Sequence, residues 1–161
     1  MWLSSTAQQA VHAVLCIAAS AEHGPVRADE IALAIDCPRN YLSKTLHALV
    51  RAGVLRSARG PKGGFQLAHR PGETTLAQVI APFEPLGERR CLLGRPRCGD
   101  EDRCVLHDRW ARVAAPVDAF LAKTTIANLL GGSSRASDAT REAIGLMRPP
   151  PRSSPHGSVA R

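Results

Sequence analysis

Two short amphipathic segments separated by a tight turn limit what this chain can fold into more than any other feature. The first segment, residues 28–35, has Asp29 and Glu30 in its first turn, where carboxylates suit the positive end of a helix. The second segment, residues 38–52, opens on Pro38, which fits the first helical position, and Gly53 follows where a helix stops. The pattern predicts two helices joined by a turn at residues 36–37.

The second predicted helix has an apolar face and a polar face. Its apolar residues recur at helical spacing and are expected to face the core: Tyr41, Leu42, Thr45, Leu46, Leu49 and Val50. The polar face carries Arg39, Asn40, Ser43, Lys44 and His47. Two short helices, the second basic near its N-terminus, form the pattern of a helix-turn-helix. An ordinary helical hairpin with a solvated face gives the same pattern, and this segment alone does not separate the two.

Residues 55–69 alternate like two strands around a Gly-rich turn, RGPKGG. A helix-turn-helix followed by a basic hairpin is a winged helix, so the predicted fold is mainly α with a small β-hairpin wing. The residues expected to contact DNA are Arg39, Asn40, Ser43 and Lys44 on the second helix, and Arg59, Gly60, Lys62 and Gly63 in the turn. Arg39 and Asn40 should lie nearest base edges in the major groove, Lys44 should contact phosphate, and Arg59 or Lys62 should reach phosphate or the minor groove. The turn could instead bind a nucleotide phosphate, but it lacks the Lys-Ser/Thr ending of such loops and precedes a strand.

Three of the five cysteines lie close together on a polar, Gly-rich stretch. Cys91, Cys98 and Cys104 are separated by six and five residues, and His107 follows three positions after the third. Sulfur ligands suit iron–sulfur clusters and zinc, and short spacers allow one loop to bring them to one point. Three interpretations stay open: an iron–sulfur cluster, a structural zinc, and redox-active thiols without a metal. Zinc sites usually contain a Cys-x-x-Cys pair, which this loop lacks.

A long amphipathic segment follows the cysteines. Apolar residues at spacings of three and four predict a helix over residues 105–130, kinked or restarted at Pro116. We expect this to be a dimerisation helix, with plain core packing as the alternative. The chain therefore divides into a winged-helix domain (1–84), a cysteine loop (85–104), the dimerisation helix and a disordered basic tail (131–161).

The chain is basic. Its 21 Lys and Arg residues exceed its 14 Asp and Glu residues, and the formal net charge of +7 favours a polyanionic partner, with nucleic acid ahead of membrane. An apolar stretch near the N-terminus resembles a signal peptide, but no Lys or Arg precedes Arg27 and the stretch is too short to span a membrane. We therefore expect a cytoplasmic protein whose thiols stay reduced and available to metals.

With both halves in view, the chain resembles the bacterial transcription regulators of the IscR and NsrR type, the Rrf-two family. The resemblance covers roughly residues 1–130 and rests on IALAIDCPRNYLSKTLHALVRAGVLRSARGPKGGFQLA, on TTIANLL, and on the set Cys91, Cys98, Cys104, His107 and Trp110. It implies a winged helix-turn-helix with a long dimerisation helix. It also implies a homodimer that binds a roughly palindromic operator in double-stranded DNA.

The same resemblance implies an iron–sulfur cluster on the three cysteines. In the IscR branch a histidine three residues after the last cysteine completes the ligand set, and His107 occupies that place. Because imidazole can replace thiolate on one iron of a two-iron cluster, we expect a [2Fe–2S] cluster, with [4Fe–4S] as the alternative. Other branches take the fourth ligand from the first helix, where His12 and then Gln8 are the candidates. The first spacer is one residue longer than is usual in the IscR branch.

The predicted function is a DNA-binding transcriptional regulator whose operator binding is switched by a cluster that senses redox state, nitric oxide, or iron and cluster supply. The alternative is a winged-helix repressor that uses zinc, thiols or no cofactor. Cys104 and His107, one helical turn apart, could also form the nucleophile of a hydrolase. No orienting third group is apparent for that pair, and we expect no enzyme.

Overall fold

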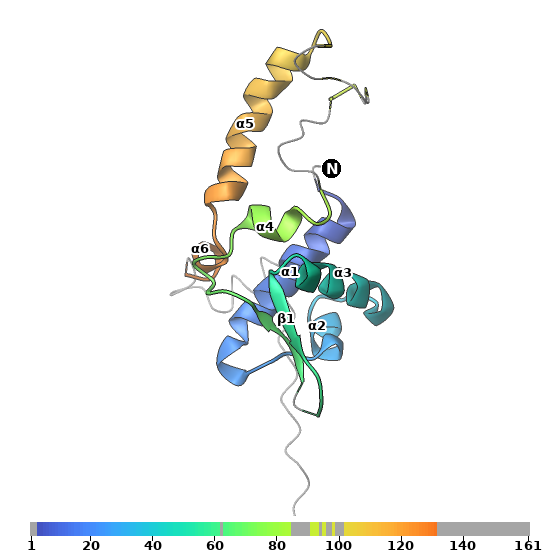
Figure 1. Ribbon diagram of the computed structural model, residues 1–161, viewed down its shortest axis with the longest axis vertical. Coiled ribbons are helices and arrows are strands. Elements are labelled where there is room, and N and C mark those ends of the chain that lie inside the picture. Colours follow the sequence, from blue (N-terminus) through green and yellow to red (C-terminus); the bar gives the residue numbers. More distant parts are fainter. Residues whose placement is uncertain are drawn as a thin grey trace, which may run out of the picture.

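The computed structural model describes residues 3–61, 63–84, 91–93, 95, 98 and 102–131. Along the chain the elements are α1 (Ser5–Ala19), the 3₁₀ helix η1 (Ala21–His23), α2 (Ala28–Ala34), α3 (Arg39–Arg51), β1 (Leu55–Ala58), β2 (Gly64–Leu67), α4 (Leu76–Ile80), α5 (His107–Lys123) and α6 (Ile126–Gly131). Helices dominate and the two strands form one hairpin (Figure 1), as the sequence predicts. Lys62 and the predicted tail after Gly131 lie outside the described residues.

Helix α1 is the centre of the packing and contacts α2, α3, α4, α6 and β2. Its side of the core consists of small and branched residues at helical spacing: Ala7, Ala10, Ala13, Val14, Leu15, Ile17 and Ala18. Alanines at this interface let the neighbouring helices approach closely, which suits a chain with few aromatic residues. The helix begins at Ser4, whose hydroxyl accepts a hydrogen bond from the backbone N–H of Ala7.

Helices α2 and α3 form the predicted helix-turn-helix. The backbone N–H of Arg27 donates to Glu30 at 3.1 Å, which satisfies one of the free donors at the start of α2. In the turn, Asp36 has a φ of +49°, a conformation that Asp tolerates better than most residues. Cys37 follows as a buried thiol, and its backbone N–H donates to the carbonyl of Ala32 at 3.0 Å.

Two details of α3 differ from the sequence prediction. Pro38 has an extended ψ of 127° and caps the helix, so the first helical residue is Arg39 rather than Pro38. Tyr41 was predicted to face the core but is 43% exposed, and its hydroxyl is hydrogen-bonded to that of Thr6 at the start of α1. A tyrosine hydroxyl needs a hydrogen-bond partner when it leaves water, and Thr6 provides one at the edge of the core. The remaining core face is as predicted, with Leu42, Thr45, Leu46 and Leu49 buried and Val50 packed against them.

The hairpin contacts α3 and the segment that precedes α2. Strands β1 and β2 pair antiparallel with Leu55 opposite Leu67 and Ala58 opposite Gly64. Gly53, with a φ of +73°, ends α3 where the sequence predicts. Phe65 forms an isolated bridge with Val26, and its ring meets the His47 ring of α3 edge to face at 6.0 Å.

The segment predicted as one helix over residues 105–130 contains two, and this prediction was wrong in its extent. Helix α5 runs through Pro116 and ends at Lys123, after which Thr124 is extended. Thr125 and Asn128 then exchange side-chain-to-backbone hydrogen bonds of 2.9 and 3.2 Å that start α6. The carbonyl of Thr124 also accepts the N–H of Leu76 at 2.9 Å, so the break is fixed by pairing with the start of α4.

Helix α5 projects from the body of the molecule (Figure 1), with its N-terminal end on the opposite side from the hairpin turn. Ala114 and Leu121 of α5 are buried, and Val117 packs against the core. Val113 and Phe120, on another face of the same helix, are exposed. The fold thus separates the hairpin from the segment that carries the cysteines.

Candidate functional site

The polar face of α3 points away from the core. Arg39, Asn40 and Lys44 are exposed, and Ser43 is half-buried. The hydroxyl of Ser43 donates to the Arg39 carbonyl at 2.9 Å, so its proton is already used within the helix. The structure therefore places the four α3 residues predicted to contact DNA on one accessible surface.

Asp29, which the sequence analysis did not assign to any site, lies beside Arg39. Its Oδ1 is 2.6 Å from Arg39 Nε, and its Oδ2 is 4.0 Å from Nη2 of Arg27. The closer pair joins the first turn of α2 to the first residue of α3. No sequence pattern marks this contact, because it depends on how the turn at residues 36–37 sets the two helices.

The turn of the hairpin is shaped by glycines. Gly60 has a φ of +105°, which favours glycine. At Gly63 a Cβ would lie 2.3 Å from the carbonyl oxygen of Ala58, so no larger residue fits there without a shift of backbone. Arg59 and Gly60 are exposed and Gly63 is half-buried, whereas Lys62 is outside the described residues. The turn therefore presents Arg59 on a backbone that another surface can approach closely.

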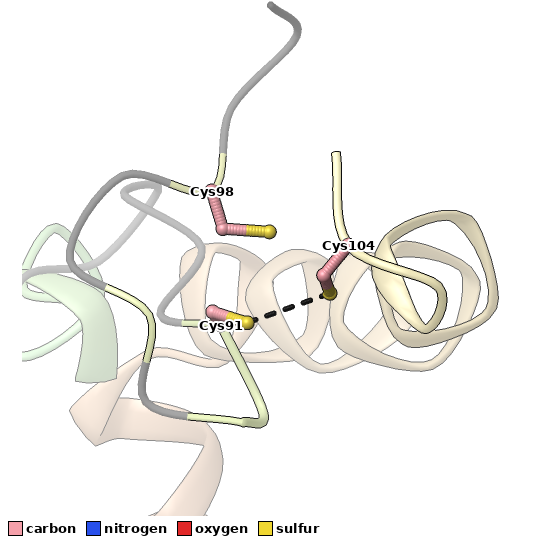
Figure 2. A group of neighbouring side chains, drawn as sticks. All are labelled: Cys91, Cys98 and Cys104. Carbon is pink, nitrogen blue, oxygen red and sulfur yellow. Dashed lines mark hydrogen bonds between the residues drawn. The ribbon is translucent and has the colours of Figure 1, made fainter. Parts of the chain in front are cut away.

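The second candidate site is the cysteine centre, which we define as Cys91, Cys98 and Cys104. Their Sγ atoms all lie within 4.8 Å of one another, and those of Cys91 and Cys104 are 3.5 Å apart. Figure 2 shows the three side chains converging on one point. All three residues are half-buried. The structure thus brings together the three sulfur ligands predicted from the sequence.

His107 contacts this centre from the start of α5. Its Nδ1 lies 3.4 Å from the Sγ of Cys98, and its backbone N–H donates to the carbonyl of Cys104 at 2.9 Å. It does not belong to the group of ligand atoms within 4.8 Å of one another, so it contacts the centre at the Cys98 edge. The pocket around these residues is completed by Leu92, Leu106 and Trp110.

The electrostatics of the centre distinguish Cys91 from Cys98. A hydrogen bond from the backbone of Arg95, with weaker ones from Leu93 and the neighbouring thiols, lowers the pKa of Cys91 to about 7. At Cys98 a backbone hydrogen bond from Cys104 favours the thiolate, but desolvation and the two adjacent thiols outweigh it and raise the pKa. Cys91 therefore ionises before Cys98.

Arg95 is a second residue that the sequence analysis missed. Besides its backbone contact with Cys91, its Nη2 donates to both carboxylate oxygens of Asp102, at 3.1 and 2.9 Å. This ion pair joins residues that lie on either side of Cys98 in the sequence. Loop contacts of this kind have no periodicity, so no sequence signal indicates them.

The alternative fourth ligands and the other thiols lie elsewhere. Gln8 on α1 donates its side-chain amide to the Leu3 carbonyl at 3.0 Å, and His12 is half-buried on the same helix. Within the described residues, neither belongs to the group of ligand atoms at the cysteine centre, and neither do Cys16 and Cys37. Burial raises the pKa of the Cys37 thiol, with a further rise from the adjacent Asp36, as befits a packing residue.

Comparison with known proteins decides the family. The model of the Rrf2 family, described as iron-dependent transcriptional regulators, matches residues 3–132. This chain belongs to the Rrf2 family. The match includes both the helix-turn-helix and the cysteine centre, and it confirms the resemblance seen in the sequence. The chain is accordingly a transcriptional regulator that binds DNA.

Individual Rrf2 relatives agree with the family match. A helix-turn-helix-type transcriptional regulator of Aquifex aeolicus is 32% identical over 133 residues, which are 81% of this chain and 92% of that protein. The regulator IscR of Photorhabdus laumondii is 30% identical over 151 residues, 93% of this chain and 92% of that protein. These alignments extend over nearly the whole length of both relatives.

Solved structures confirm the winged-helix fold of this Rrf2 chain. IscR of T. potens superposes with a TM-score of 0.69 at 24% identity, covering 85% of this chain and 91% of that one. CymR, the global cysteine regulator of B. subtilis, also superposes with a TM-score of 0.69, at 22% identity, covering 82% of this chain and 98% of that one. In the part of the Rrf2 chain that the structure describes, no helix has the length and apolar character that a bilayer span requires.

The donor set of this Rrf2 chain suits a soft metal centre, because it combines three thiols with one imidazole. A single tetrahedral ion with metal–sulfur bonds of about 2.3 Å holds its sulfurs about 3.8 Å apart. The 3.5 Å separation of Cys91 and Cys104 is close to that value. Cys91 and Cys104 are thus close enough to be ligands of one metal ion, whether that ion is a zinc or one iron of an iron–sulfur cluster.

Proposed function

We propose that this Rrf2 regulator binds its operator under the control of an iron–sulfur cluster held by Cys91, Cys98 and Cys104, with His107 as the fourth ligand. The observation that carries the proposal is the convergence of the three Sγ atoms within 4.8 Å, with the imidazole 3.4 Å from one of them. The iron dependence of the family and the lack of a Cys-x-x-Cys pair in this loop favour iron over zinc. One imidazole ligand suits [2Fe–2S], and [4Fe–4S] is the alternative form.

The residues at the two ends of the cysteine loop connect the centre to the rest of the fold. Before the loop, Glu84 Oε1 accepts the backbone N–H of Ser4 at 2.9 Å, at the cap of α1. After it, His107 begins α5 and bonds the Cys104 carbonyl. A bound cluster would link the three cysteines across this loop, and oxidant, nitric oxide or iron starvation would remove that link. Without it no metal bonds join Cys91 to Cys104, and the relation between α1 and α5 is free to change.

On the DNA side, α3 occupies the major groove and the hairpin contacts phosphate or the minor groove. The residues that make these contacts in the proposal are Arg39, Asn40, Ser43 and Lys44 on α3, and Arg59, Gly60, Lys62 and Gly63 on the hairpin. The accessible polar face of α3 and the closely approachable turn support it. Because helix N-termini of this class reach base edges, Arg39 and Asn40 read sequence and Lys44 holds phosphate.

A homodimer on a pseudo-palindromic operator completes the proposal. Val113 and Phe120 on α5 remain 58% and 57% exposed, and a second copy of the helix is the partner that would cover them. The working division of the chain is then a DNA-binding domain (1–84), a cluster loop (85–104), a dimerisation segment (105–130) and a basic tail (131–161). A regulator of transcription with reduced cluster ligands works in the cytoplasm.

The test is metal and sulfide analysis, with a visible spectrum, on full-length protein purified without oxygen. Wild-type protein should be brown and carry two irons and two sulfides per chain, as a [2Fe–2S] cluster requires. Cys104→Ala should lose both, and Cys16→Ala, which removes a thiol outside the centre, should keep both. Colourless protein with one zinc per chain would make the centre a structural clamp and refute cluster control.

The contact between Cys91 and Cys104 favours a second candidate function, a thiol switch. Sulfurs 3.5 Å apart, one with a pKa lowered to about 7, can form a disulfide: the Cys91 thiolate attacks a peroxide-class oxidant and becomes a sulfenic acid, and the Cys104 thiol then displaces water from it. The two thiols together release two protons and two electrons, and the peroxide is reduced. Peptide mapping of cluster-free protein after peroxide should find this disulfide in wild type and not in Cys104→Ala. If the disulfide forms and operator affinity stays the same, thiol switching is excluded.

A hydrolase has little support. His107 Nδ1 contacts Cys98 rather than Cys104, the cysteine that the sequence suggested as a nucleophile. The pKa of Cys98 is raised, which is opposite to what an activated thiolate needs. The relatives of this chain are transcriptional regulators.

A further inference from the structure

An acidic side chain stands at the DNA-facing start of α3. Asp29 Oδ1 is 2.6 Å from Arg39 Nε, and the side chains of Asp29 and Arg39 are 49% and 66% exposed. An exposed ion pair of this kind contributes little to stability. A carboxylate close to DNA phosphates also weakens electrostatic attraction to any sequence. Neither the fold nor phosphate binding therefore explains why this contact is made.

The geometry of the pair leaves Arg39 with a defined binding edge. A guanidinium carries five N–H donors in a planar fork, and Asp29 occupies the donor at Nε. No described residue bonds the two terminal nitrogens, which leaves them for a second partner, and arginine most often uses them on O6 and N7 of guanine. An unpaired arginine would sample many rotamers and reach phosphates as readily as bases. An arginine held at Nε is already oriented before DNA arrives, which reduces the entropy lost on binding.

We propose that Asp29 is a positioning residue for base recognition. It holds the Arg39 guanidinium toward a guanine edge in the major groove and lowers its attraction to phosphate. The proposal rests on the proposed DNA-binding role of α3 and adds a residue from α2 to it. Asp29 touches no DNA in this scheme, and it acts on sequence preference through Arg39.

Lys44 provides the contrast within the same helix. It is exposed, and no described carboxylate lies within ion-pair distance of it. A lysine ammonium without such a partner suits phosphate, as a point charge without directional preference. The helix thus carries one cation restrained by an acid and one that is not, and only the restrained one is expected to read a base.

The test is selection from a randomised pool of double-stranded DNA with the full-length protein. The variants are Asp29→Asn, Asp29→Glu, Arg39→Ala and Asp29→Asn/Arg39→Ala. Asp36→Asn is the matched control, because it removes the same charge from the adjacent turn, and Asn tolerates the φ of +49° found there. Melting temperatures within a few degrees of wild type would show that each variant is folded.

Wild-type protein should enrich a consensus with a guanine in each half-site, and Arg39→Ala should lose that preference. Asp29→Asn should lose the same guanine. Its affinity for the selected site relative to a scrambled duplex should fall about tenfold, within the range known for one bidentate arginine–guanine contact. Its affinity for the scrambled duplex alone should rise. Asp29→Glu should restore part of the preference, Asp36→Asn should keep all of it, and the double variant should match Arg39→Ala.

Two outcomes overturn the inference and leave the DNA-binding function standing. The first is an Asp29→Asn protein that keeps the guanine and binds all sequences tighter by one factor, since Asp29 would then act only as a charge. The second is an Arg39→Ala protein that still selects the guanine. A wild-type protein that enriches no sequence would contradict the proposed function itself, which makes the two failures distinguishable.

Discussion

The Sγ atoms of Cys91 and Cys104 lie 3.5 Å apart although the residues are 13 positions apart in the chain. The same Cys91 accepts a hydrogen bond from the backbone of Arg95, which lowers its pKa to about 7. Cys98, the third member of the centre, has a raised pKa. The chemically identical thiols of Cys91 and Cys98 thus have different pKa values because of their positions in one loop.

This inequality predicts different alkylation profiles in cluster-free protein. Because the thiolate is the reactive form, the rate at Cys91 should rise about tenfold between pH 6 and pH 8 and then level off, as a pKa near 7 requires. The rate at Cys98 should continue to rise above pH 9. Mass spectrometry of iodoacetamide-treated peptides measures both rates in one sample. A common profile for the two thiols would contradict the proposed hydrogen bonding.

Gly64 should be indispensable for the hairpin. A Cβ at this position would lie 2.5 Å from the carbonyl oxygen of Val26, the atom that accepts the N–H of Phe65 at 2.8 Å. Gly64→Ala must displace that backbone, and we expect it to lower the free energy of unfolding by about 1–3 kcal/mol. Gly72→Ala is the control, since its nearest neighbour is the Ala127 side chain at 3.9 Å, and its effect should stay within about 0.5 kcal/mol. If Gly64→Ala and wild-type protein have the same melting temperature, this role of Gly64 in the hairpin is refuted.

Features that depend on local periodicity could be predicted from the sequence. The apolar stripe of α3, the stop at Gly53 and the Gly-rich turn depend on neighbours a few positions away, and the structure confirms them. The break between α5 and α6 was missed although a signal exists, because Thr125 is followed three residues later by Asn128. Asn is a weaker partner than Glu or Gln in such a cap, so the apolar repeat masked it.

The contacts that give the two sites their chemistry could not be predicted. The sequence indicates which cysteines gather but not that Cys91 pairs with Cys104, since loop geometry has no repeat. Helical spacing predicts Tyr41 as a core residue, although the side chain is exposed. Spacing alone does not reveal that the Tyr41 hydroxyl has a hydrogen-bond partner on another helix. Asp29 looks like an ordinary first-turn acid until the fold places it against Arg39.

Lys44→Ala should weaken binding to all DNA sequences by a similar factor. Lys44 is an exposed ammonium on the polar face of α3, which is expected to hold a phosphate. The slope of log K against log salt should become shallower by about 1, because one fewer counterion is released. Arg51→Ala, which removes an exposed charge from the far end of the same helix, should leave the slope nearly unchanged. Sequence-selective weakening by Lys44→Ala would instead indicate a base contact.

Phe120→Asp should convert the proposed dimer to monomers. Phe120 is 57% exposed on α5, so an aspartate at this position leaves the fold of one chain intact. A second copy packed over this position would bury the unpaired carboxylate, which costs free energy and opposes dimer formation. Sedimentation velocity should show the change at micromolar concentration. Leu33→Asp is the control, because Leu33 is 60% exposed on α2, and it should remain dimeric. A dimer that survives Phe120→Asp would place the interface elsewhere.

The start of α1 contacts both the approach to the cysteine loop and α3, the helix proposed to read DNA. Glu84, the last described residue before Cys91, accepts the N–H of Ser4 at 2.9 Å. Two residues further along α1, the hydroxyl of Thr6 is hydrogen-bonded to that of Tyr41 on α3. One helical turn therefore links the two candidate sites through side chains that are not among the residues assigned to either site.

Glu84→Ala and Tyr41→Phe should each reduce the coupling between the sites without removing either one. We expect iron and sulfide content to be unchanged and the difference in operator binding free energy between loaded and cluster-free protein to shrink by about 0.5–2 kcal/mol. Glu73→Ala is the matched control, since Glu73 also accepts a backbone N–H, that of Arg70 at 3.3 Å, before the start of α4. Fluorescence anisotropy on one operator in both protein states measures the difference. If both variants retain the full wild-type difference, the signal travels through α5 and the dimer rather than through α1.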